Sequence, residues 1–212
     1  MQIELQQWIG LSPIMLIYAF FAIGVAAYIR GYSGFGFSAL TVTSLALILP
    51  PSEIVPTAYM LEIAASIHML PLVWRSIDWK ILRWLFFGVV MGTPFGINFL
   101  EEVPQEIMRL VISGIVLTAS LLLWKNIRFR SSANWYSILT VCFFSGVING
   151  AAGIGGLPVV LFFLSISASS TLTRSTMVAY LFISDIYAVM LPGSQQLIST
   201  ELLGRTVIFL IP

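Results

Sequence analysis

Two glycine-rich segments, 119 residues apart, interrupt the long uncharged stretches of this chain. Residues 31–36 read GYSGFG and residues 150–156 read GAAGIGG, so three glycines of the first segment match three of the second. The run from Ser131 to Thr173 carries no charge and would be roughly 65 Å long as a single helix. Because the hydrocarbon core of a bilayer is about 30 Å thick, this run must turn back, and residues 149–156 have the composition of a turn.

The composition places the chain in a lipid bilayer. Of its 212 residues, 58% are hydrophobic and 9% are charged, whereas a soluble domain has about 25% charged residues. The net charge of +1 says nothing about partners, and we expect no nucleic-acid partner for a chain of this class. The single Cys142 excludes a disulfide within the chain. The first apolar stretch lacks a basic n-region and a cleavage site, so we interpret it as a retained span. The sequence therefore predicts an integral protein of the cell (inner or plasma) membrane.

Apolar segments recur along the chain and divide into two repeats. They lie near residues 13–29, 35–49, 54–74, 81–99, 106–124, 135–149, 154–168, 172–191 and 201–212. The first repeat is predicted over residues 1–127 and the second over residues 128–212, with its fifth segment cut at Pro212. Since a membrane span needs about 20 residues, we expect the C-terminal part of the second repeat to be missing from this sequence.

Positive charge in short loops predicts that the two repeats are inverted. The basic loops 75–83 and 125–130 are separated by two spans and by the acidic loop 101–106, so they share one side, which we take as the cytoplasm. The first repeat has an odd number of segments, so the second enters the membrane from the opposite face. The sequence therefore predicts an all-α membrane protein with two inverted repeats, each containing a broken hairpin.

The glycine-rich tips are the predicted binding site for an anion. The second half of each hairpin, 35–49 or 154–168, is short for a span, which favours re-entrant tips at membrane depth. Glycine lets the backbone approach a ligand closely, and the helix that follows offers unpaired N–H groups. Paired broken segments of this kind are typical of secondary transporters. The alternative is close helix packing, which we expect of the stripe Gly88, Gly92 and Gly96.

Arg30 precedes the first tip, and its counterpart in the second repeat is Asn149. An arginine at membrane depth can bind an oxyanion through two N–H groups, so we expect Arg30 to be the main counter-charge and Asn149 a neutral partner. The alternative is that Arg30 reaches the membrane interface as an ordinary anchor. The predicted substrate-binding residues are Arg30, Gly31, Ser33, Gly34, Gly36, Asn149, Gly150, Gly153, Gly155 and Gly156.

Two acidic residues, Glu62 and Asp185, lie inside apolar segments. Glu62 shares a helical face with Tyr59 and Ser66, and the counterpart of Ser66 in the second repeat is Asp185. A carboxyl group within the bilayer can carry a proton through a transport cycle, so both acids are candidates for proton coupling. The alternative is an acid held by a structural partner such as Arg30.

Two other functions fit parts of this pattern. The GYSG at residues 31–34, with His68 on a later segment, resembles the Ser–His dyad of rhomboid-type intramembrane serine proteases. However, the counterparts of Ser33 and His68 are Ala152 and Tyr187, so the second repeat keeps the loop without nucleophile or base. A passive anion channel also fits the scaffold, although acids inside the membrane favour a coupled transporter.

The second tip with its flanks, NGAAGIGGLP at residues 149–158, resembles the signature loop of the TauE/SafE sulfite-exporter family. Residues 30–37 are similar to the divergent first copy of that loop, although Phe37 stands where the second repeat has Gly156. The resemblance implies a permease or exporter of small sulfur-containing or organic anions, such as sulfite, sulfoacetate or thiosulfate. It also implies about eight transmembrane helices in the full protein and no enzymatic activity.

The partners follow from this interpretation. We expect a small anionic substrate, the lipid bilayer and protons as coupling ions, and the pattern is compatible with an oligomer. Nothing in the sequence predicts a cofactor or a metal site, and the predicted catalytic set is empty.

Overall fold

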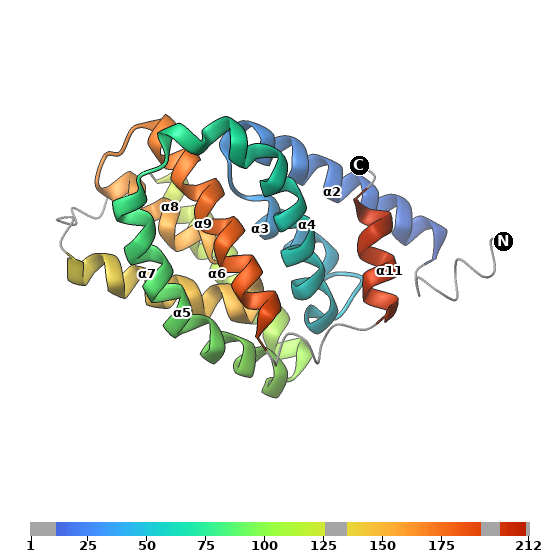
Figure 1. Ribbon diagram of the computed structural model, residues 1–212. Coiled ribbons are helices and arrows are strands. Elements are labelled where there is room, and N and C mark those ends of the chain that lie inside the picture. Colours follow the sequence, from blue (N-terminus) through green and yellow to red (C-terminus); the bar gives the residue numbers. More distant parts are fainter. Residues whose placement is uncertain (1–11, 126–134, 192–199, 211–212) are drawn as a thin grey trace.

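The computed structural model describes residues 12–125, 135–191 and 200–210, and the regular elements in these ranges are all helices (Figure 1). The all-α prediction is therefore confirmed. The α-helices are α2 (Pro13–Ser33), α3 (Phe37–Leu45), α4 (Pro51–Val73), α5 (Trp79–Glu102), α6 (Gln105–Trp124), α7 (Trp135–Ala152), α8 (Gly156–Ser165), α9 (Ser170–Met190) and α11 (Thr200–Phe209). The predicted boundary between the repeats, at residues 127 and 128, lies outside the described residues.

Local capping explains where several of these helices begin. Ser12, Asp78 and Ser169 precede α2, α5 and α9, and each side chain accepts a hydrogen bond from a backbone N–H of the first turn. Pro51 is the first residue of α4, a position where the missing N–H of proline costs nothing. The starts of α2, α5 and α9 are thus fixed by side chains that satisfy unpaired backbone N–H groups.

Four helical stretches are long and apolar enough to cross a membrane: α2, Pro51–Ser76, α5 and α6. Their outer faces expose large apolar side chains such as Ile14, Phe21 and Phe87, which suit contact with lipid. By contrast, α3 and α8 have 9 and 10 residues and reach about half-way through a hydrocarbon core. The chain is an integral membrane protein that combines spanning helices with two half-length ones.

The helices of the two repeats begin and end at matching positions. The offset of 119 residues relates the ends of α2 and α7, the starts of α3 and α8, and the starts of α4 and α9. Gly34 and Gly153 both have positive φ, at 83° and 68°. Each donates its N–H over 2.7 Å to the carbonyl four residues earlier, in Arg30 and Asn149. The same turn therefore breaks the chain in both halves, and we name residues 34–36 the first break and residues 153–155 the second break.

The glycine stripe of α5 packs against α7, in the most extensive helix pair of the described structure. A Cβ added at Gly88 would collide with Cys142, and one added at Gly92 or Gly96 would collide with carbonyl groups of α7. The predicted packing role of this stripe is confirmed. Because α7 leads directly into the second break, this close contact also fixes the position of that break.

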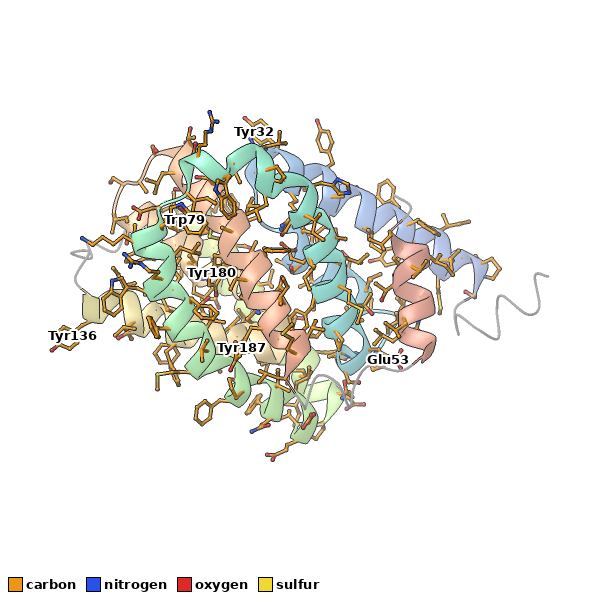
Figure 2. The ribbon with its side chains drawn as sticks, viewed as in Figure 1. Tyr32, Glu53, Trp79, Tyr136, Tyr180 and Tyr187 are labelled. Atoms are coloured by element: carbon orange, nitrogen blue, oxygen red, sulfur yellow. The ribbon has the colours of Figure 1, made fainter. Side chains whose placement is uncertain are left out.

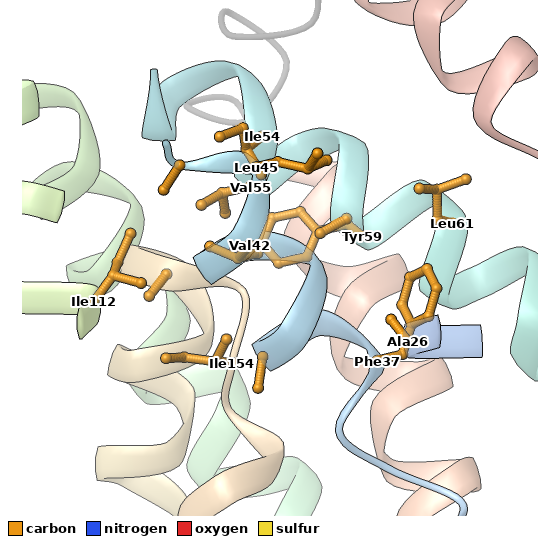
Figure 3. Packing of buried hydrophobic residues seen from close by; sticks show 14 of the residues in the cluster. Ala26, Phe37, Val42, Leu45, Ile54, Val55, Tyr59, Leu61, Ile112 and Ile154 are labelled. Carbon is orange, nitrogen blue, oxygen red and sulfur yellow. The ribbon is translucent and has the colours of Figure 1, made fainter. Parts of the chain in front are cut away.

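Buried apolar side chains from both repeats share one core. In Figure 3, Val42 of α3, Tyr59 of α4 and Ile154 of the second break lie in the same cluster. The ends of the molecule differ in chemistry, since Tyr32 and Trp79 lie towards one end and Glu53 towards the other (Figure 2). The breaks are therefore held inside the protein, between two ends of the helix bundle.

Candidate functional site

Arg30 lies near the C-terminal end of α2 and is 1% exposed. Its Nη1 forms an ion pair with Oε1 of Glu62 at the middle of α4, and its Nη2 donates a 2.6 Å hydrogen bond to Ser66 Oγ, one turn further along α4. Ser38, in the first turn of α3, donates a 2.6 Å hydrogen bond to Oε2 of Glu62. Arg30 is therefore not an interfacial anchor, and Glu62 has the structural partner that the sequence offered as its alternative role.

The second break repeats this arrangement without the arginine. Asn149 Nδ2 donates a 3.1 Å hydrogen bond to Asp185 Oδ1, and this pair is the counterpart of Arg30 and Ser66. Asn149 Oδ1 accepts the N–H of Gly155 over 3.2 Å, so one amide side chain joins Asp185 to the break. Asp185 also interacts electrostatically with Arg30. The two breaks therefore share one buried group of charges.

Each break is also held by a side chain from the opposite half of the chain. The Tyr59 hydroxyl on α4 is shared between the carbonyls of Asn149 and Gly150, at 2.5 and 3.2 Å. Arg174 on α9 donates a 2.8 Å hydrogen bond to the carbonyl of Gly31, the counterpart of Gly150. The Gly31 and Gly150 carbonyls lie in the last turns of α2 and α7, where carbonyls lack a partner within the helix, and the Asn149 carbonyl also accepts the N–H of Gly153. Any movement of one repeat against the other must break or carry along these contacts.

A small cavity lies where the two breaks meet. Its lining residues are Phe35, Gly36, Ser38, Ala39, Gly153, Ile154, Gly156, Leu157 and Leu181. The cavity has a volume of about 10 Å³, close to what a single water needs, so it is too small for a polyatomic anion. Ser38 links this cavity to the ion pair, because its hydroxyl contacts Glu62. The structure thus shows a closed site in which the carboxylate of Glu62 lies one hydrogen bond behind the wall and Arg30 lies behind Glu62.

The predicted binding residues occupy different places around this cavity. Those that line it are Gly36, Gly153 and Gly156. Asn149 and Gly155 lie directly behind the lining residues, and Arg30 lies two contacts behind them, through Glu62 and Ser38. Substrate binding by any of these residues stays a prediction.

Gly31 and Ser33 lie on the outer side of the first break. The Gly31 carbonyl contacts Arg174, and the Ser33 hydroxyl donates to the carbonyls of Ile29 and Phe35, over 2.9 and 2.7 Å. These described contacts of Ser33 all go to backbone groups, which is not the arrangement of a serine activated by His68.

Gly34 and Gly150 are required for close packing. A Cβ at Gly34 would lie 2.6 Å from Cγ of Arg174, and one at Gly150 would collide with the carbonyl of Thr93 in α5. For these two positions the structure favours the alternative interpretation, in which glycine allows helices and side chains to approach closely.

Three residues that position the site were not among the predicted binding residues: Ser38, Tyr59 and Arg174. Their contacts join residues 24, 90 and 143 positions apart along the chain, and no sequence spacing reveals such pairs. The available signal was the shared helical face of Tyr59 and Glu62, which places the tyrosine near the acid but not at the second break.

Known proteins were compared with the whole chain. The family described as Sulfite exporter TauE/SafE matches residues 19–212. This range includes both breaks and the charge group, by which we mean Arg30, Glu62 and Asp185. No curated protein and no solved structure shows a significant match.

Proposed function

The chain belongs to the sulfite exporter TauE/SafE family, whose members are membrane transporters rather than enzymes, and we propose that it carries a small sulfur-containing or organic anion between its two breaks. Sulfite, sulfoacetate and thiosulfate are suitable substrates, and the inner (plasma) membrane is the proposed location. The observation that carries this proposal is the buried Arg30–Glu62 pair, joined through Ser38 to the cavity between the breaks.

The backbone at the junction suits an anion. The half-length helices α3 and α8 both begin at the breaks, and their first residues, Phe37 and Gly156, follow directly on the glycine turns. The N–H groups of a first helical turn have no partner within the helix, and the helix dipole places partial positive charge there. Two such ends beside one cavity would bind an anion from both repeats without a basic side chain in contact.

Glu62 and the substrate compete for Arg30 in this mechanism. While Glu62 carries its negative charge, it neutralises Arg30 and repels a second anion. When Glu62 takes up a proton, the positive charge of Arg30 becomes available to an anion in the widened cavity, with Ser38 as the shared hydrogen-bond partner. Release of the proton restores the ion pair and expels the anion. Binding of one anion is thereby coupled to binding of one proton.

Asp185 is the second candidate for coupling, and its contacts also support a positioning role. Through Asn149 it is connected to the N–H of Gly155, so a change in its charge would be felt at the second break. Alternating access would follow from rocking one repeat against the other, with the Tyr59 and Arg174 contacts as the points that hold them together.

The test is anion flux into proteoliposomes that contain the full-length protein, with and without a pH gradient. Radiolabelled sulfite, thiosulfate, sulfoacetate and acetate form the substrate panel. The wild type is expected to carry a sulfur anion faster when the gradient supplies protons on the side of uptake. Glu62→Gln removes the titrating carboxyl at nearly unchanged volume, so its remaining flux should not respond to the gradient.

A matched control uses the other described carboxyl of α4 that forms an ion pair. Glu53 pairs with Arg205 at the opposite end of α4 from the first break, so Glu53→Gln should keep the gradient response. Flux that ignores the gradient in the wild type would indicate a passive channel instead. Absence of flux for every anion would contradict the proposed function.

A further inference from the structure

A second and much larger cavity opens beside the first break. Its volume is about 660 Å³, within the range of small-molecule sites. Its lining residues are Tyr32, Ser33, Phe35, Leu72, Val73, Ser76, Leu123, Val160, Leu164, Ala168, Ser170, Thr171, Thr173, Arg174 and Ser175. We name this cavity the vestibule. It lies at the end of the molecule marked by Tyr32 and Trp79 in Figure 2, the end that carries the basic loop 75–83.

The wall of the vestibule has two chemical halves. One half carries the guanidinium of Arg174 and the hydroxyls at the start of α9, among them Thr171 and Thr173. The other half is apolar, with Leu72, Leu123 and Leu164 from three further helices. This combination matches an organic anion that has a charged head and a short apolar body.

Arg174 is held in place but keeps an unused donor. One Nη2 hydrogen bond reaches the Gly31 carbonyl over 2.8 Å, while Nε is buried and makes no hydrogen bond in the described structure. A buried N–H without an acceptor is costly, so a shift of the Arg174 side chain that gives its Nε an acceptor on a ligand would be favourable. The absence of a side chain at Gly34 leaves the space that Arg174 occupies, since a Cβ there would lie 2.6 Å from its Cγ.

Phe35 stands between the two cavities. It lines the vestibule on one side and the small cavity between the breaks on the other, and it is the one lining residue that these two cavities share. Its ring packs against the buried apolar cluster of α5, α8 and α9. Rotation of this ring is therefore the shortest way to connect the vestibule with the closed site.

We propose that the vestibule is a second anion-binding site, at which Arg174 captures a sulfonate or carboxylate from the basic-loop side and Phe35 controls its passage to the breaks. This inference rests on the proposed transport function for its biological meaning. The binding itself is independent of transport, because the charge and the cavity are present in the closed state. Arg174 has Val55 as its counterpart, so the corresponding position in the first repeat offers no such charge.

Cysteine labelling in detergent tests the charge of the vestibule without any flux. In a Cys142→Ala background, Thr171→Cys places a thiol on the exposed vestibule wall. The anionic reagent sulfonatoethyl methanethiosulfonate should react with it roughly three- to tenfold more slowly once Arg174→Gln is added, and the trimethylammonium analogue should react faster. Arg174→Lys keeps the charge and should keep the rates. The control thiol Glu102→Cys, at the C-terminal end of α5, should be unaffected by either substitution.

Protection of the thiol from labelling by an added compound identifies the class of ligand. Ethanesulfonate should slow labelling of Thr171→Cys in the parent and have no effect with Arg174→Gln. If added phosphatidylglycerol protects and ethanesulfonate does not, the vestibule holds a lipid headgroup, and the proposal is wrong. The proposal would also be overturned if each reagent reacted with Thr171→Cys at the same rate in the parent and with Arg174→Gln added.

The role of Phe35 is tested at Ala39, which lines the inner cavity and is almost fully buried. Ala39→Cys should be labelled slowly, and Phe35→Ala should accelerate its labelling at least tenfold, whereas Phe35→Leu should have a smaller effect. An unchanged rate would remove Phe35 as the gate. In proteoliposomes, Arg174→Gln should raise the KM for the anion at least fivefold. Wild-type protein that shows no flux but retains protection by ethanesulfonate would contradict the transport proposal alone.

Discussion

The two breaks begin with the same glycine turn but differ in their last residue and in chemistry, since Gly36 has a φ of 92° and its counterpart Gly155 a φ of −59°. Each ends a long helix with a glycine at positive φ and starts a half-length helix three residues later. In the first break the buried polar pair is Arg30 with Glu62, and in the second it is Asn149 with Asp185. A cavity of 660 Å³ opens beside the first break through a wall that includes Arg174. The two repeats therefore place their helices at matching positions. The residues that differ between them make the two sides of the site chemically different.

The contacts between the repeats also differ between the first and the second break. Arg174 holds the first break by one hydrogen bond and lies partly exposed in the vestibule, whereas Tyr59 holds the second break and is 1% exposed. Because the Arg174 guanidinium lies beside water, it can exchange its hydrogen bond to the Gly31 carbonyl for one to an anion. A buried tyrosine has no such alternative acceptor. We infer that the first break is the one that responds to the ligand and the second is the more rigid partner.

The largest effect is expected from removing one member of the buried ion pair. Glu62→Ala leaves the Arg30 guanidinium uncompensated and should lower the free energy of unfolding by about 3–5 kcal/mol, with loss of flux. The double variant Arg30→Met, Glu62→Met should recover most of the stability without flux. Thermal unfolding in detergent measures the first effect and proteoliposome flux the second. Equal destabilisation by the single and double variants would show that the charges do not compensate each other.

The packing around Gly34 differs from that around Gly153, its counterpart at positive φ in the second break. Gly34→Ala must adopt an unfavourable φ, at about 1–2 kcal/mol, and must also displace Arg174. Gly153→Ala carries the same backbone penalty, but its Cβ would meet Tyr59 and Val55 at an ordinary 3.5 Å. We expect Gly34→Ala to be the more destabilising in urea titrations. Gly31→Ala serves as the control, because a Cβ there has open space. The reverse order would mean that the second break is the more tightly packed.

Tyr59→Phe should have a moderate effect on the second break alone. It removes the hydroxyl shared by the Asn149 and Gly150 carbonyls while keeping the ring in the core, so a loss of about 1–1.5 kcal/mol is expected. Hydrogen exchange at the end of α7 should accelerate, with no change at the end of α2. Tyr28→Phe, on the exposed face of α2, is the control. Faster exchange at both breaks would show that they open together.

The smallest effect is expected at His68. Its side chain is exposed on α4, outside the charge group, so His68→Gln should change the free energy of unfolding by less than about 0.5 kcal/mol. The response of flux to a pH gradient should be that of the parent. A lost response would place proton coupling at this histidine instead of Glu62.

Many features of the site were predictable because they are local or repeated. The positions of the breaks follow from glycine patterns, and the pairing of Ser66 with Asp185 as counterparts follows from the constant offset. The glycine stripe of α5 likewise indicated close packing from its four-residue spacing. By contrast, the close contact of Gly150 with Thr93 could not be predicted, because the sequence does not show that α5 lies against α7 at that point.

The sequence by itself determined the membrane class, the helices, the two breaks and the identity of the buried charges. These properties depend on composition and on spacing along the chain, where hydrophobic length and glycine conformations act locally. Only the tertiary structure decided that Arg30 is paired with Glu62, that Ser38 links this pair to the cavity, and that Arg174 and Tyr59 hold opposite breaks. Those contacts join helices that are distant in sequence, and their geometry is set by how the helices pack.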